Sequence, residues 1–242
     1  MKILGVIPAR YASTRFPAKP LADIGGKSMV QWVYTQATRS SKISTVVVAT
    51  DDQRIFDHVK SSGGNVCMTS PDHASGTDRC FEALSKQNEK YDYVINIQGD
   101  EPFISPDQID LLGKLLDGVT ELATLAKKID DDESLRNPNV VKLVKAVSGD
   151  ALYFSRHPIP YIRNSGTKHT FFKHIGMYAY RSDILEKITM LPVSSLEKAE
   201  SLEQLRWLEN GYKIKVAETD LETIGVDTPE DLEKAIAFLK NK

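Results

Sequence analysis

The sequence predicts a single α/β domain with a mostly parallel, mixed central sheet and a β-rich insertion in its second half. Short apolar segments alternate with helical patterns through the first half, an order typical of parallel βαβ units. Several β-like segments then follow one another between about residues 140 and 182. The chain has 242 residues, enough to bury a substantial core, so residues 1–242 are taken as one domain.

The strands of the first half are short apolar runs. Residues 3–7 form a run typical of a buried parallel strand, and residues 45–50 and 93–98 repeat the pattern. Residues 53–61, which lie between the second and third runs, have a helical pattern. Because ligands collect beyond the carboxyl ends of the strands in such sheets, the loops after the three runs are expected to form one binding rim.

The loop within residues 7–21, IPARYASTRFPAKPL, is the most informative segment of the chain. Arg10, Arg15 and Lys19 follow the first strand, and the small residues between them let backbone N–H groups approach an anion closely. This arrangement predicts a phosphate-binding loop. The alternative, from charge alone, is a solvated basic loop.

The elements of the second half are more varied. Residues 140–147 and 151–154 are β-like, prolines then interrupt the chain, and residues 171–180 alternate as a further strand. Apolar residues at helical spacing predict a helix across residues 196–208. The pair Thr228-Pro229 predicts the start of the last helix, with the threonine as N-cap and the proline at the first position.

Composition argues against several functions. With 31 basic and 33 acidic residues the formal net charge is -2, so neither nucleic acid nor an anionic membrane is an expected partner. No apolar run approaches the ~20 residues needed to span a bilayer. The first strand begins almost at the N-terminus and leaves no room for a leader, so a cytoplasmic protein is expected. The two cysteines, Cys67 and Cys80, are expected to be ordinary reduced thiols.

Seven segments together resemble one enzyme family. The pattern R-x-x-S-T-R-x-P-x-K-P-L after the first strand is similar to the opening of cytidylyltransferases that activate acidic keto-sugars. The closest resemblance is to the 3-deoxy-manno-octulosonate cytidylyltransferase (CMP-Kdo synthetase) family. Six further segments, in the family's order, extend it over nearly the whole chain: SGTDR (75–79), NIQGDEPF (96–103), ALYFSR (151–156), HIGMYAYR (174–181), LEQLRWLENGYKI (202–214) and GVDTPEDL (225–232).

The resemblance carries expectations about fold and reaction. It implies a Rossmann-like nucleotide-diphospho-sugar transferase fold in a single cytidylyltransferase domain. It also implies that CTP and 3-deoxy-manno-octulosonate (Kdo) are converted into CMP-Kdo and pyrophosphate for lipopolysaccharide biosynthesis. The insertion of about residues 140–182 would help form the acceptor pocket and the contact between two subunits, so a homodimer is expected.

Two aspartates stand where the rim of the sheet is expected. Asp100 follows the strand 93–98 directly, and Asp227 precedes the start of the last helix. Taken alone, Asp100 also suits a turn, and Asp227 also suits a residue that favours a helix N-terminus. The resemblance implies that both bind Mg²⁺, which prefers one or two carboxylates together with substrate phosphates and water.

Cations near a triphosphate supply counter-charge during nucleotidyl transfer, and Arg10, Arg15 and Lys19 are the candidates. By resemblance, Arg15 and Lys19 contact the triphosphate, and Lys19 lies closest to the charge that develops during transfer. Together with Asp100 and Asp227, these two residues form the expected catalytic set.

Recognition of the base needs hydrogen bonds from backbone groups beside small residues. Residues 74–76 are also consistent with a plain loop before a helix capped by Thr77. The resemblance assigns the nucleoside contacts to residues of the first loop and of two later motifs: Pro8, Ala9, Ser75, Gly76, Arg79 and Gln98.

An acidic sugar needs a pocket that combines a cation with polar side chains. A single histidine on a strand is more often structural, and Gln204 also fits a capping box with Ser201, as Glu197 does with Ser194. Arg163 and Arg181 are rival partners for the sugar carboxylate. The resemblance assigns the acceptor site to Arg156, His174, Tyr178, Glu203 and Gln204.

Two other functions stay open at this point. A cytidylyltransferase for another acidic sugar, 8-amino-Kdo or sialate, belongs to the same class, and the motifs at 174–181 and 202–209 argue against sialate. A non-catalytic nucleotide-binding module belongs to a different class. The presence of Lys19, Asp100 and Asp227 argues against such a module, because a sensor needs affinity without both metal ligands.

Overall fold

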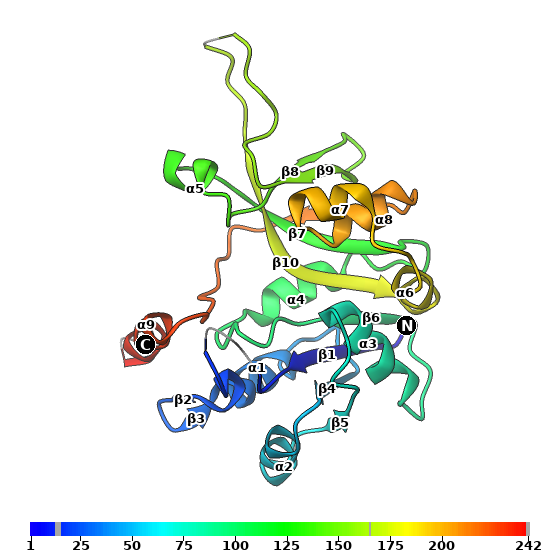
Figure 1. Ribbon diagram of the computed structural model, residues 1–242, viewed down its shortest axis with the longest axis vertical. Coiled ribbons are helices and arrows are strands. Elements are labelled where there is room, and N and C mark those ends of the chain that lie inside the picture. The colour runs from blue at the N-terminus through cyan, green and yellow to red at the C-terminus, as the bar shows by residue number, and fades with distance from the viewer. Residues whose placement is uncertain (13–15, 165, 241–242) are drawn as a thin grey trace.

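The computed structural model describes residues 1–242 except 13–15, 165 and 241–242. Its centre is a β-sheet with the strand order β11-β7-β10-β6-β1-β4-β5, and β8 and β9 continue from β10 (Figure 1). The pairs β1–β4, β1–β6, β4–β5 and β7–β11 are parallel, whereas β10 is antiparallel to β6, β7 and β8. The predicted α/β class with a mostly parallel, mixed sheet is confirmed.

The parallel strands β1, β4 and β6 are buried on both faces, whereas β5 at the edge of the sheet is half-buried. Along β1, Ile3 and Ile7 join one apolar cluster while Leu4 and Val6 join another, as the two-residue period of a strand requires. The strands are β1 (Ile3–Ala9), β4 (Thr45–Thr50), β5 (Val66–Met68) and β6 (Tyr93–Asn96).

Helices cover both faces of this sheet. One face packs against α1 (Met29–Ala37), α2 (Gln53–Ser61) and α4 (Pro106–Gly113). The other packs against α3 (Gly76–Ser85), α6 (Ser182–Thr189) and α8 (Gln204–Glu209). The result is a three-layer domain with the carboxyl ends of β1, β4 and β6 at one rim.

The second half adds four further strands to the sheet: β7 (Leu122–Lys128), β8 (Lys142–Lys145), β9 (Ala151–Ser155) and β10 (Phe172–Arg181). The short helix α5 (Asp132–Arg136) lies between β7 and β8 in the chain. Residues 140–182 are β-rich, but β10 lies in the central sheet between β6 and β7 instead of outside it. Its residues 177–180 are buried, which explains this central place. Between β9 and β10 the chain extends away from the body as a long arm (Figure 1).

The predicted single helix over 196–208 is wrong. The chain forms α7 (Ser195–Glu200) and α8, and Ser201 between them takes a left-handed backbone conformation with φ 52°. The Arg156 guanidinium donates hydrogen bonds to the carbonyls of Glu200 and Ser201 at 2.7 and 3.3 Å. These bonds satisfy carbonyls at the end of α7, where the helix itself supplies no partner.

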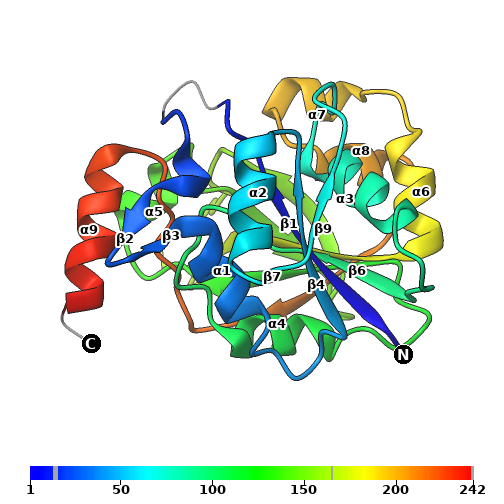
Figure 2. The ribbon, with the colours of Figure 1, turned by 90° about the horizontal axis from the view of Figure 1, so that it is seen from below.

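The last elements are β11 (Ile214–Glu218) and α9 (Pro229–Lys240). The predicted start of α9 is confirmed, because Thr228 Oγ1 accepts from the N–H of Asp231 at 3.3 Å and the Asp231 carboxylate accepts from Thr228 N–H at 3.2 Å. Figure 2 shows α9 at the edge of the molecule beside the short strands β2 (Asp23–Ile24) and β3 (Lys27–Ser28).

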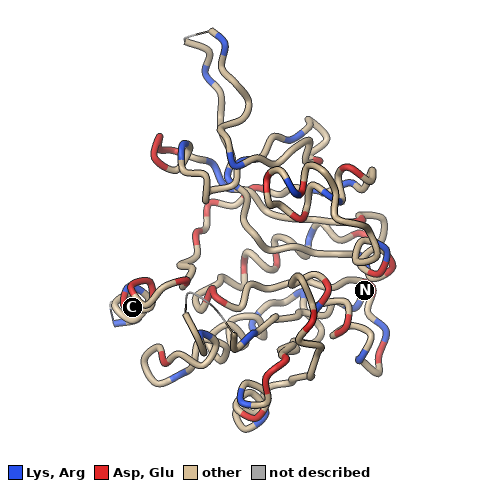
Figure 3. Tube along the Cα trace, in the orientation of Figure 1, with Lys and Arg blue, Asp and Glu red and all other residues tan. Residues whose placement is uncertain are grey.

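Charged residues are spread over the whole trace, with acidic and basic positions interspersed (Figure 3). This distribution agrees with the near-zero net charge and with the absence of a global field expected from the sequence. Among the described helices, none is long and apolar enough to cross a membrane.

Candidate active site

A cavity of about 410 Å³ opens beyond the carboxyl ends of β1 and β6, and we call it the β1 cavity. Ser75 is not among its lining residues, because its side chain caps α3 by accepting from the N–H of Asp78 at 3.1 Å. Arg15 lies outside the described residues. The other predicted nucleotide residues all line the cavity: Pro8, Ala9, Arg10, Lys19, Gly76, Arg79 and Gln98.

The two predicted metal ligands lie on either side of one lysine. Lys19, at the start of the short 3-10 helix η1 (Lys19–Leu21), places its Nζ 3.0 Å from Asp100 Oδ2 and 3.1 Å from Asp227 Oδ1. A backbone hydrogen bond from Val226 to the carbonyl of Asp100 holds the two loops together at 2.9 Å. Next to Asp100, burial raises the pKa of Glu101 to about 7.

The floor of the β1 cavity requires a close approach of two backbones. A Cβ atom on Gly99 would lie 2.5 Å from the carbonyl oxygen of Pro8. Any side chain at this position would therefore push the loop after β6 away from the end of β1. Glycine at position 99 lets Gln98 and Asp100 lie beside the phosphate loop.

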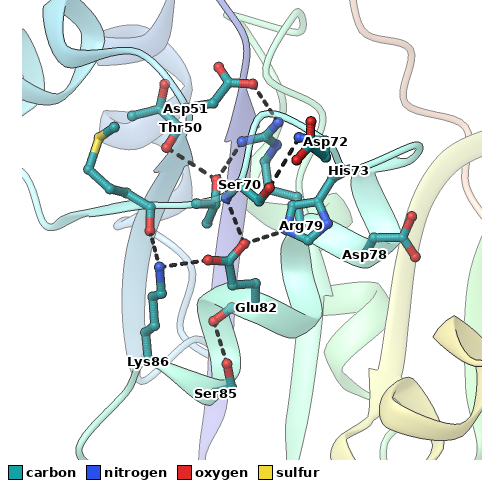
Figure 4. A network of polar contacts seen from close by, with 12 residues as sticks. Thr50, Asp51, Ser70, Asp72, His73, Asp78, Arg79, Glu82, Ser85 and Lys86 are labelled. Carbon is teal, nitrogen blue, oxygen red and sulfur yellow. Dashed lines mark hydrogen bonds and ion pairs between the residues drawn. The ribbon is translucent and has the colours of Figure 1, made fainter.

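Arg79 is fully buried and is held by two neighbours (Figure 4). One terminal nitrogen donates to Asp51 Oδ2 at 2.7 Å, and the other donates to Thr69 Oγ1. Its Nε is buried and has no hydrogen-bond partner among the described residues. The terminal nitrogens of Arg79 therefore fix the loop before α3.

Glu82 organises the same loop from α3. Its carboxylate accepts from the N–H of Ser70 at 2.8 Å, contacts His73 Nε2 and pairs with Lys86 Nζ at 2.6 Å (Figure 4). Burial alone would raise its pKa, but hydrogen bonds from Lys86, Ser70 and His73 lower it to about 2. The carbonyl of His73 accepts a hydrogen bond from Arg10. The loop is thus tied to both α3 and the first loop.

A second cavity of about 220 Å³ adjoins the first, and we call it the β10 cavity. Among the predicted acceptor residues, Tyr178 and Glu203 line it. Glu203 Oε2 accepts from Thr77 Oγ1 at 2.8 Å, and burial raises the pKa of this carboxyl. Four residues line both cavities, so the two form one continuous site: Pro8, Gly76, Gln98 and Gly99.

His174 lies behind the β10 cavity and is not among its lining residues. Its ring contacts the rings of Tyr178 and Phe154, with centroids 5.1 and 5.2 Å away. Its Nε2 lies 2.9 Å from Thr124 Oγ1. Burial lowers the pKa of His174 to about 3, so the ring is neutral at physiological pH.

The other two predicted acceptor residues do not reach this cavity. Arg156 donates to the backbone carbonyls of Pro138, Glu200 and Ser201, which makes it a brace between loops. The rival Arg181 pairs with Asp183 at the far end of β10. Gln204 is the first residue of α8 and is buried, and the capping box with Ser201 does not form, because α8 begins without a side-chain cap.

Sequence reasoning missed five residues that line the β10 cavity: Thr77, Asn96, Gly99, Gly176 and Tyr180. Thr77 and Asn96 lie within the SGTDR and NIQGDEPF segments, next to residues that were named. Tyr180 is two positions after Tyr178 on β10, and the two-residue period of a strand places both on one face. This period was a signal that could have identified Tyr180.

A larger cavity, of about 560 Å³, lies at the opposite end of the sheet, near the starts of β7 and β11. It is lined by residues such as Asp117, Arg181 and Lys213 and contains none of the assigned site residues. The rim predicted from strand polarity is therefore the place where the candidate residues converge.

The matches to known proteins first identify the class of protein. A family model described as Cytidylyltransferase matches residues 4–214. A cytidylyltransferase structure from Leptospira borgpetersenii shares the fold with a TM-score of 0.66 at 17% identity, covering 100% of this chain and 88% of that chain. The chain therefore belongs to the cytidylyltransferases and shares their fold.

Closer relatives narrow the class to one family. The 3-deoxy-manno-octulosonate cytidylyltransferase of Cytophaga hutchinsonii is 58% identical over 96% of this chain and 95% of its own length. That of Parabacteroides distasonis is 58% identical over 100% of both chains. A solved CMP:2-keto-3-deoxy-manno-octonic acid synthetase complexed with CTP has a TM-score of 0.94 and 46% identity, covering 100% of this chain and 99% of that one. The chain belongs to the 3-deoxy-manno-octulosonate cytidylyltransferase family.

Proposed function

We propose that this protein transfers the cytidylyl group of CTP to 3-deoxy-manno-octulosonate, giving CMP-Kdo and pyrophosphate, a step that would serve lipopolysaccharide biosynthesis. The observation that carries the proposal is the pair of adjoining cavities with a shared wall. The β1 cavity is lined by Arg10, Lys19 and Arg79, which suits a triphosphate. The β10 cavity is lined by hydroxyl, amide and carboxyl groups, which suit a polyhydroxylated sugar.

The reaction follows from this arrangement. The anomeric 2-hydroxyl oxygen of the sugar forms a bond to the α-phosphorus while the bond from that phosphorus to the pyrophosphate oxygen breaks. The hydroxyl proton passes to water. Two substrates held across a shared wall are placed for in-line attack, and such positioning provides much of the rate enhancement. Lys19 meets negative charge that grows on the phosphoryl oxygens, a contribution of about 3 kcal/mol for a well-placed group.

The donor set fits Mg²⁺. Asp100 and Asp227 both contact the ammonium of Lys19, so their carboxylates are arranged to share a cation. Two carboxylates completed by phosphate oxygens and water are a common environment for this ion. Within the described part of the chain, no cluster of three or more histidine, cysteine or acidic residues is placed to hold a metal. Asp100 and Asp227 would hold Mg²⁺, which would neutralise phosphate charge when bound.

The proposal extends to assembly and location. The arm between β9 and β10 projects from the body, and its Tyr161 is 84% exposed (Figure 1). The resemblance implies that the contact between two subunits lies in the insertion that carries this arm, so we propose a homodimer. The expected site of action is the cytoplasm, where CTP is made. Sedimentation analysis of the purified chain tests the dimer, because a monomer at micromolar concentration would contradict it.

Pyrophosphate release tests the reaction. We expect turnover with CTP and 3-deoxy-manno-octulosonate, and strong preference for CTP over ATP and GTP, because a base pocket with fixed polar groups penalises a base that leaves them unpaired. UTP is the stricter comparison, since it differs from CTP in hydrogen-bonding pattern and not in size. The 8-amino sugar and sialate are the acceptor controls. Comparable kcat/KM for CTP and ATP, or no turnover with any of these sugars, would overturn the proposal.

A further inference from the structure

The strand β10 carries an irregularity at the wall of the β10 cavity. Ile175 pairs with Leu125 and Tyr178 pairs with Thr124, so two residues of β10 lie opposite a single step of β7. These two residues are Gly176 and Met177. Irregularities of this kind are frequent near active sites, where they redirect a side chain or a carbonyl.

The carbonyl of Gly176 supports Gln98. Gln98 Nε2 donates a hydrogen bond to this carbonyl. Gln98 also lines both cavities, so its side chain stands between the two proposed substrates. A Cβ atom on Gly176 would lie 3.3 Å from Gln98 Nε2, closer than almost all such contacts, so glycine makes this approach possible. The position of Gln98 therefore depends on the shape of the irregular segment.

One buried hydroxyl holds that segment in place. Thr124 is fully buried on β7, and its Oγ1 lies 3.1 Å from the carbonyl oxygen of Ile175 and 2.9 Å from that of Met177. The same Oγ1 lies 2.9 Å from His174 Nε2. A single hydroxyl therefore joins both ends of the irregular segment to a histidine.

Counting protons favours one direction for these hydrogen bonds. A threonine hydroxyl has one proton and two lone pairs, and a backbone carbonyl can only accept. If Thr124 donated to His174, neither carbonyl would receive a proton from Thr124. If Thr124 shares its one proton between the two carbonyls, a lone pair is free to accept from a proton on His174 Nε2. The second arrangement satisfies more buried groups, and it is the one that buried polar groups favour.

We propose that Thr124 is a positioning residue of the acceptor pocket: its hydroxyl fixes His174 as the Nε2-protonated tautomer and holds the irregular segment of β10 that supports Gln98. In this tautomer Nδ1 is the only acceptor on the neutral ring. The inference rests on the proposed function for the identity of the acceptor. The hydrogen-bond arrangement itself does not depend on the proposed function.

The first measurement is made on the unmodified protein. Long-range ¹H–¹⁵N correlation spectra of the full chain, labelled at its histidines, report which imidazole nitrogen of each neutral ring carries the proton. His174→Asn serves only to assign the signal of His174. We expect His174 to show the Nε2-protonated tautomer. A proton on Nδ1 would overturn the proposal.

The second measurement compares Thr124→Val, which keeps the shape and removes the hydroxyl, with Thr124→Ser, which keeps the hydroxyl. Loss of a buried hydrogen-bonding group commonly reduces an affinity by about tenfold. We therefore expect Thr124→Val to raise the KM for 3-deoxy-manno-octulosonate about tenfold with little change in the KM for CTP, and to disturb the His174 tautomer. Thr124→Ser should keep both properties. Thr219→Val is the matched control. Thr219 is also buried, and among the described residues its hydroxyl accepts a hydrogen bond from Leu221 N–H alone, beyond the end of β11.

The outcomes are distinguishable. An unchanged sugar KM in Thr124→Val, or equal losses in the valine and serine variants, would overturn the proposal. If Thr124→Val does not fold, the serine variant and the tautomer of the unmodified protein still decide it. If the unmodified protein released no pyrophosphate from CTP with this sugar, the proposed function would fail, whereas the tautomer would still confirm or refute the Thr124–His174 arrangement.

Discussion

Substitution of Lys19 by alanine tests how its ammonium group offsets the repulsion between two nearby carboxylates. Its Nζ lies 3.0 Å from an oxygen of Asp100 and 3.1 Å from one of Asp227, so these two oxygens are at most about 6 Å apart. Two negative charges at this distance repel by about 3 kcal/mol at an effective dielectric constant of about 20, and by about 0.7 kcal/mol in bulk water. The Asp227 side chain is 48% exposed, so screening brings the expected repulsion to about 1 kcal/mol.

Lys19→Ala should therefore change two quantities. It should lower kcat by about a hundredfold or more, because a cation that meets charge developing in the transition state contributes about 3 kcal/mol. It should also increase the stabilisation that Mg²⁺ gives the substrate-free protein, because a divalent ion would relieve the new repulsion between Asp100 and Asp227. The assays are pyrophosphate release at saturating substrates and thermal unfolding with and without Mg²⁺.

Lys2→Ala is the matched control for Lys19→Ala. Lys2 Nζ pairs with Glu89 at the same distance, 3.0 Å, but both side chains are more than half exposed and lie at the start of β1, away from the rim. We expect this variant to keep its kcat and its response to Mg²⁺. The reasoning is refuted if folded Lys19→Ala keeps near-normal kcat, or if Mg²⁺ shifts its Tm no more than it shifts that of the unmodified protein.

Three further predictions concern other parts of the site. Asp100→Asn and Asp227→Asn should each remove most turnover, and the double variant should be little worse than the poorer single one; losses in kcat/KM that multiply independently and ignore Mg²⁺ concentration would argue against a shared site. The pKa of His174 is lowered to about 3, so the unfolded chain binds more protons below pH 6.5 and this group destabilises the fold as the pH falls. Between pH 6.5 and 5.5 this group should lower the free energy of unfolding by about 1 kcal/mol. Urea unfolding of His174→Gln should not show this decrease, and an identical pH dependence in both proteins would contradict the prediction. Gly99→Ala should raise the KM for CTP and lower the Tm, because its Cβ would lie 2.5 Å from the Pro8 carbonyl oxygen, and unchanged values of both would show that the loop adapts without cost.

Local patterns in the sequence predicted much of the fold. The apolar runs at β1 and β4 and the threonine-proline pair before α9 identify elements through short-range physics, namely burial of both strand faces and capping of a helix. The rim was predictable for the same reason, since strand polarity decides which loops share an edge. Strand polarity is therefore sufficient to place the loops that carry Lys19 and Asp100 at the same edge of the sheet.

Long-range contacts account for what the sequence did not predict. The break between α7 and α8 depends on Arg156, 44 and 45 residues before the carbonyls to which it donates. The local pattern of leucines contains no sign of that partner. The role of Thr124 could not be predicted either. It depends on contacts with His174 and with the irregular segment of β10, which are distant from Thr124 in the sequence. The same contacts explain why Arg156 is a brace and not a lining residue.

The Lys19–Asp227 contact joins residues 208 positions apart, almost the full length of the chain. A ribosome delivers the phosphate loop early and Asp227 near the end of synthesis. A nascent chain can therefore form β1 and its loop long before it can complete the charge arrangement around Lys19. The same holds for a chain cut before Asp227: it would keep the strands of the central sheet and the residues that line both cavities but lose one carboxylate. Only a chain that extends beyond Asp227 therefore has the complete set of charged groups proposed for turnover.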